Sequence, residues 1–120
     1  MGKTLIKIAA VYLVIGVLLG YYMSVAGDYV LTGVHAHVNL LGWATLGIIG
    51  LIYHVFPDLE NNIWAKLHFW LHNIGLPIMM IALALLIAAG MSIYPLVAFG
   101  ATLTVLGIIA FLINVLRKLK

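Results

Sequence analysis

The sequence contains no cysteine and very few charged residues, and both absences narrow what the chain can be. Without cysteine there is no disulfide, no thiolate metal site and no CxxCH motif for covalent attachment of haem. Only 8% of the 120 residues are charged, whereas 66% are hydrophobic. These values lie far outside the range of soluble globular proteins and place the chain among membrane proteins.

Four stretches are apolar enough to span a bilayer, which requires roughly 20 predominantly apolar residues. Because the connections between them are short, neighbouring helices must run antiparallel and pack side by side. We therefore expect an all-α integral membrane protein with a single domain, built as an up-down antiparallel bundle or arc over residues 1–120. The expected spans are residues 4–24, 29–55, 63–89 and 92–116.

All basic residues fall on one side of this four-span arrangement: Lys3, Lys7, Lys66, Arg117, Lys118 and Lys120. The opposite loops, around residue 28 and around residues 90–94, carry none. Lysine and arginine accumulate on the cytoplasmic side of membrane proteins. We therefore expect a protein of the prokaryotic cytoplasmic membrane with both termini in the cytoplasm. The net charge of +3 reflects this topology, and we expect no nucleic-acid partner.

The polar residues of interest are five histidines, all within or at the ends of the two central spans: His35, His37, His54, His68 and His72. An ionisable residue inside a membrane span is a functional-site hypothesis by default. The structural alternative is a neutral imidazole that is hydrogen-bonded to a carbonyl of the next helix. We favour this alternative for His54, which lies beside the turn at Pro57.

Helical phase separates the remaining histidines into two pairs. His35 and His37 point about 200° apart on a helix, so they cannot bind one small metal ion but can serve two pockets. His68 and His72 share a face, a spacing that can hold one metal ion or flank one cofactor. Asn39, four residues after His35, can orient the His35 imidazole.

Depth in the membrane limits which of these side chains can meet. Counted from the turn at Leu59, His37 and His72 differ in depth by about nine residues, or roughly 13 Å at 1.5 Å per residue. The two axial ligands of one haem must lie at nearly equal depth, so a His37–His72 pair within one chain is strained. The depth-matched partners of His37 are Met79 or Met80, or a histidine from another copy.

Two motifs resemble a known family. "VHAHVNLLGW" (residues 34–43) followed by "LIYHVFP" resembles the second helix of the catalytic subunit of haem-copper oxidases and of the related nitric oxide reductases. In that helix a His-x-Asn marks the ligand of the low-spin haem, and here it reads His37-Val38-Asn39. "HFWLHNIGLPIMM" (residues 68–80) completes the pattern of small stand-alone proteins that look like one part of that subunit.

The resemblance implies an arrangement for the histidines. The family's large subunit has three four-helix arcs, each about the size of this chain, and one arc carries a His-x-His that serves two haem pores. By analogy, a ring of three copies would hold a haem b between His35 of one chain and His37 of its neighbour; a dimer is also open. Trp43 lies too deep to be an interface anchor and suits packing against a flat cofactor. His68 and His72 would be secondary ligands or would contact the haem propionates.

The function we expect is that of a haem b protein with two histidine ligands, acting in electron transfer or redox sensing with a respiratory donor or acceptor. No complete haem-copper active site is recognisable, so we do not expect oxygen or nitric oxide reduction by this chain alone. An additional copper near His68 and His72 stays open. The alternatives are a histidine-based copper or zinc protein, a gas sensor, and a cofactor-free assembly or interaction protein of a respiratory complex.

Overall fold

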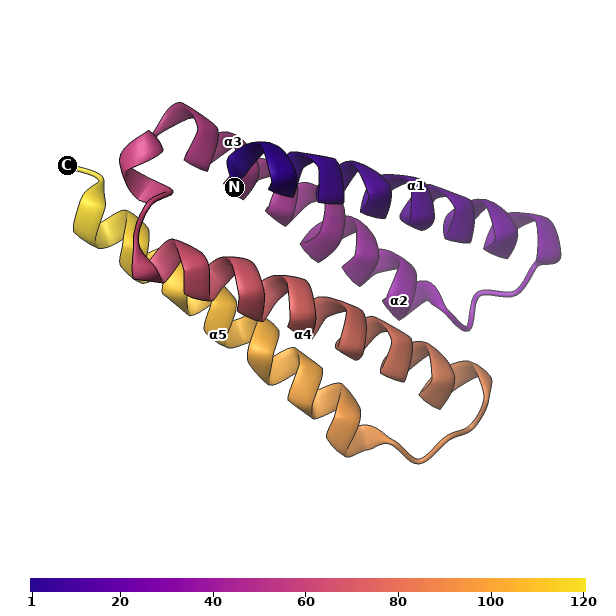
Figure 1. Cartoon of the computed structure of the whole chain (residues 1–120). Coiled ribbons are helices and arrows are strands. Elements are labelled where there is room, and N and C mark those ends of the chain that lie inside the picture. Colours follow the sequence, from indigo (N-terminus) through magenta and orange to yellow (C-terminus); the bar gives the residue numbers. More distant parts are fainter.

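The computed structural model describes all 120 residues and contains helices but no strands. Four helices are long and apolar enough to cross a membrane by length and composition, which confirms the predicted number of apolar spans. Their axes are roughly aligned, with neighbours in the chain running antiparallel, in a flat arrangement that measures 48 × 29 × 18 Å (Figure 1). The first, third and fourth of them are α1 (Gly2–Ala26), α4 (Ile63–Ala88) and α5 (Tyr94–Lys118).

The second long helix is not uniform along its length. It begins as α2 (Thr32–His37), continues as the π-helix η1 (Val38–Thr45) and ends as α3 (Leu46–Val55). A π-helix has wider turns than an α-helix, and short π segments frequently occur at functional sites. Because η1 begins at the residue after His37, its wide turns lie between the His35–His37 pair and the remainder of this helix.

The second helix begins later than the predicted residue 29, because local hydrogen bonds hold the chain in a turn. Gly27 ends α1 with a φ of 62°. The Val30 amide then donates to the Asp28 carboxylate (3.2 Å), and the Thr32 hydroxyl donates to the Tyr29 carbonyl (2.6 Å). Such bonds compete with helix formation. The other predicted ends lie within about two residues of the observed ones.

The turn between the second helix and α4 is fixed by side-chain amides. After the 3₁₀ turn η2 (Pro57–Leu59), the Asn62 carboxamide caps α4 by accepting from the amides of Trp64 (3.0 Å) and Ala65 (3.1 Å). The same side chain donates to the fully buried Asn114 of α5 (2.9 Å). Asn62 therefore both caps α4 and joins the ends of α4 and α5.

Glycines allow close packing within each of the two helical hairpins. In the first hairpin, a Cβ atom on Gly16 or Gly20 of α1 would lie 2.5 Å from the Asn39 amide or 2.7 Å from the His35 ring. In the second hairpin, a Cβ atom on Gly100 of α5 would lie 2.5 Å from the backbone nitrogen of Met79. Helix backbones approach this closely only where small residues line the contact.

Replacing Gly100 with alanine should destabilise the α4–α5 hairpin, because the added methyl group meets backbone that cannot move aside. We expect a loss of about 1–3 kcal/mol, typical of overpacking, measured as a lower thermal unfolding midpoint by circular dichroism in detergent. Gly33→Ala is the matched control, since nothing lies within 4 Å of the added Cβ atom. Equal midpoints for the two variants would contradict the close approach of α4 and α5.

Candidate functional site

His35 lies in α2 and packs against the glycines of α1. Its Nδ1 atom is 2.9 Å from the carbonyl oxygen of Gly16. A carbonyl only accepts hydrogen bonds, so Nδ1 carries the proton and the lone pair of the neutral ring lies on Nε2. The Asn39 amide donates to the backbone carbonyl of His35 (2.8 Å), so Asn39 lies beside His35 but this bond does not reach the imidazole.

His37 has the same neutral tautomer as His35, but it donates to a carbonyl of its own helix. Its Nδ1 atom lies 2.7 Å from the carbonyl oxygen of Gly33, one turn earlier, which leaves the Nε2 lone pair free. The side chain is exposed and lines a groove of about 320 Å³ between the second helix, α4 and α5. Met79 and Thr104 line the same groove. Of the two methionines predicted at the depth of His37, Met79 shares its groove, whereas Met80 lies in a different groove.

The other predicted pair, His68 and His72, is buried and hydrogen-bonded to itself. Both side chains have no exposed surface. The His68 Nε2 atom lies 3.2 Å from His72 Nδ1, and the two rings are almost perpendicular at 87°. Their outer nitrogens are also engaged, His68 Nδ1 by the Tyr53 hydroxyl (3.2 Å) and His72 Nε2 by the Leu41 carbonyl (3.0 Å).

The direction of this chain of hydrogen bonds follows from its last member. The Leu41 carbonyl can only accept, so His72 donates through Nε2 and accepts at Nδ1. His68 then donates through Nε2 and accepts at Nδ1 from the Tyr53 hydroxyl. All four ring nitrogens are used, so either histidine could bind a metal or a haem only if this chain opened.

The structure keeps the two histidine pairs apart. No group of three or more histidine or acidic side chains is placed to hold a metal ion. Trp43 lies in a third groove, of about 280 Å³, with Ile6 and Ile48 among its neighbours, and not in the groove of His37. His54 is exposed near the end of α3.

Sequence reasoning missed Tyr53 and the backbone carbonyl of Leu41 as partners of the buried histidines. A signal for Tyr53 was present, because the depth count from Leu59 places Tyr53 and His68 only about three residues apart. The carbonyl of Leu41 left no such signal. It belongs to the π-helix η1, whose wide turns no apolar pattern in this stretch indicated.

Comparison of the chain with protein-family models, with curated proteins and with solved structures finds no match.

The Tyr53→Phe substitution should destabilise the protein, because it removes the only donor to His68 Nδ1 in a fully buried site. An unsatisfied buried acceptor costs about 1–3 kcal/mol, which would lower the unfolding midpoint in detergent. Tyr21→Phe serves as the control, since Tyr21 is 68% exposed on α1. If Tyr53→Phe unfolds at the same temperature as Tyr21→Phe, the directed chain through His68 and His72 is wrong.

Proposed function

We propose that this chain is an integral membrane protein that binds haem b non-covalently through His35 and His37 and acts in electron transfer or redox sensing. The observation that carries the proposal is the shared polarity of these two rings. Each donates from Nδ1 to a backbone carbonyl and keeps its Nε2 lone pair free. Metal-binding histidines commonly have this arrangement, because the hydrogen bond fixes the tautomer and the ring orientation.

Insertion into a membrane is supported by the surface and by the distribution of charge. Large apolar side chains are exposed along all four long helices, among them Val25, Leu40, Ile81 and Leu116. Contiguous apolar surface of this kind marks contact with lipid or with other proteins. Both chain ends and the α3–α4 turn lie at one end of the molecule (Figure 1), and all six basic residues lie in or close to these segments. By the positive-inside rule this end faces the cytoplasm.

The residues present fit a haem held between two copies of the chain. His35 faces α1 and His37 faces the groove beside α4 and α5, so the two rings cannot meet around one iron within one chain. In a homo-oligomer, His35 of one copy and His37 of the next would supply two imidazoles from similar depths. A haem with two axial imidazoles exchanges single electrons and leaves no open position on iron.

A second axial partner for His37 is favoured by one specific observation. Met79 lines the same groove as His37 and comes from the same chain. Histidine and methionine together form a known axial pair in cytochromes. This arrangement would not require a second copy, so it can be separated from the two-histidine arrangement by experiment.

The spectrum of the purified protein tests haem binding directly. We expect an intense Soret band and, after reduction, sharp α and β bands. His35→Ala and His37→Ala should each weaken haem retention by more than about tenfold, since loss of groups that merely orient a ligand already costs 10–100-fold. His54→Ala should retain haem normally. A colourless protein that contains copper or zinc would support the metal-binding alternative, and one with neither would support a cofactor-free role.

Co-expression of the two histidine variants distinguishes the axial arrangements. If haem lies between copies, an oligomer containing both His35→Ala and His37→Ala chains has some interfaces with both histidines, so haem binding should partly return. Met79→Leu should leave the spectrum unchanged. If His37 pairs with Met79, His35→Ala retains haem on its own, co-expression adds nothing, and Met79→Leu alters the spectrum. Carbon monoxide binding by unmodified reduced protein would instead indicate a five-coordinate gas sensor.

A further inference from the structure

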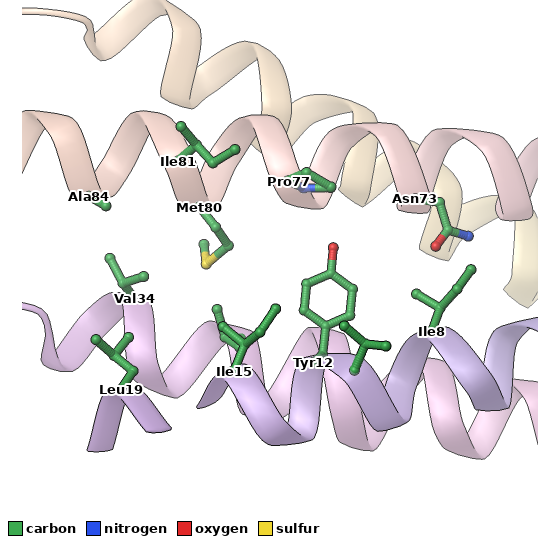
Figure 2. A pocket seen from close by; sticks show the side chains of 12 residues that line it. Ile8, Tyr12, Ile15, Leu19, Val34, Asn73, Pro77, Met80, Ile81 and Ala84 are labelled. Atoms are coloured by element: carbon green, nitrogen blue, oxygen red, sulfur yellow. The ribbon is translucent and has the colours of Figure 1, made fainter. Parts of the chain in front are cut away.

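The largest groove of the molecule is lined by no histidine. It has a volume of about 630 Å³ and runs between α1 and α4, with Val34 and Val38 of the second helix also in its wall. Ten of the twelve lining residues are hydrophobic, Tyr12 included, and the other two are Asn73 and Pro77. Figure 2 shows the groove with Tyr12 pointing from α1 toward α4, and Asn73 pointing from α4 toward α1. The Tyr12 hydroxyl and the Asn73 amide are the polar side-chain groups of the wall.

Both polar residues lie near the middle of their helices. Tyr12 is the eleventh of the 25 residues of α1, and Asn73 is the eleventh of the 26 residues of α4. At 1.5 Å per residue, each is about 15 Å or more from either end of its helix. In a bilayer this depth is the centre of the hydrocarbon region, where water does not satisfy polar groups.

The Tyr12 hydroxyl has no hydrogen-bond partner in the chain. Every buried polar side-chain atom does have one, so this hydroxyl is accessible from the groove. The ring itself is held in place, because it lies against Gly42. A Cβ atom there would be only 2.4 Å from Cγ of Tyr12. The hydroxyl is therefore a fixed polar group that faces the groove.

Asn73 offers hydrogen-bond acceptors at the same depth. Its side-chain amide donates to the carbonyl of Phe69 (2.7 Å), which leaves the side-chain oxygen unpaired. Pro77, four residues later and also in the groove wall, has no N–H group, so the backbone carbonyl of Asn73 lacks its helical partner. The groove thus presents a hydroxyl donor from α1 and acceptors from α4.

The chemistry of the occupant follows from these unpaired groups. The acyl chain of a phospholipid would fill the groove but leave them unsatisfied, and its head group stays at the membrane surface. A hydroxyl group on a flat apolar ring can accept from Tyr12 and donate to Asn73 at the same time. We infer that this groove binds a membrane-dissolved molecule of the quinol class, with the ring hydroxyl between Tyr12 and Asn73.

This inference rests on the proposed membrane insertion but not on haem binding. It also predicts a preference between redox forms. The hydroxyl of a quinol can pair with both residues, whereas the carbonyl of the oxidised quinone can accept from Tyr12 but cannot donate to Asn73. One hydrogen bond contributes about 1 kcal/mol, so the quinone should bind about fivefold more weakly than the quinol.

The test is a titration of the full-length protein in lipid nanodiscs with a short-tailed ubiquinol under anaerobic, reducing conditions, followed by quenching of intrinsic fluorescence. The titration is repeated with the oxidised quinone and with the haem-free His37→Ala protein. We expect saturable binding, tighter for the quinol, with or without haem. Tyr12→Phe should weaken quinol binding about fivefold, and Tyr21→Phe, exposed on the same helix, should not.

Several results would overturn the inference. Non-saturable uptake that is equal in unmodified protein and Tyr12→Phe would mean simple partitioning into lipid. Equal affinity for quinol and quinone would exclude the paired hydroxyl. A crosslink between copies through cysteines placed at Ile15 and Ile81, with no quinol binding, would mean that a second copy covers the groove. Extraction of the protein from membranes by alkaline carbonate would contradict membrane insertion itself and so identifies failure at that earlier step.

Discussion

Donation of a hydrogen bond from an imidazole N–H group to a backbone carbonyl is the interaction on which the functional arrangement of this chain depends. It occurs three times, to Gly16, Gly33 and Leu41. A peptide carbonyl cannot donate in return, so each bond determines which ring nitrogen carries the proton. His35 and His37 each keep a free lone pair. His72 instead ends a buried chain of hydrogen bonds in which no ring nitrogen is free. The same interaction thus leaves one ring nitrogen free in His35 and His37, whereas every ring nitrogen of His68 and His72 is paired.

The parts of the fold that could be predicted from the sequence are those determined by hydropathy and by turn residues. Four apolar stretches and the turn at Pro57 correspond to features of the structure. The start of the second helix could not, because it depends on whether Asp28 and Thr32 bond to the nearby backbone or solvent. The two alternatives differ by only a small free energy, and residue propensities for helix or turn do not resolve such a difference.

The sequence predicted which side of its helix each histidine of the candidate site faces, but not its hydrogen-bond partner. Helical phase alone places His35 and His37 on different sides of one helix and His68 and His72 on the same side. It does not say that a glycine pair on α1 leaves room for the His35 ring, or that His72 reaches a carbonyl of the second helix. Those partners depend on how closely two helices approach, and this is set by small residues far away in the sequence.

The π-helix η1 has a consequence for how the two ends of the second helix are oriented. Its eight residues, Val38–Thr45, use wider turns than an α-helix would, so they behave as an α-helix that has accommodated an inserted residue. Deleting one residue of this segment would return it to α geometry with α2 and α3 in nearly their present orientation. Winding all eight residues as an α-helix would instead rotate α2 by about 100° relative to α3. His35 and His37 would then face other neighbours, while Tyr53 would stay where it is. A change in the winding of this segment alone, with the sequence and its hydropathy untouched, therefore suffices to redirect one half of the site independently of the other.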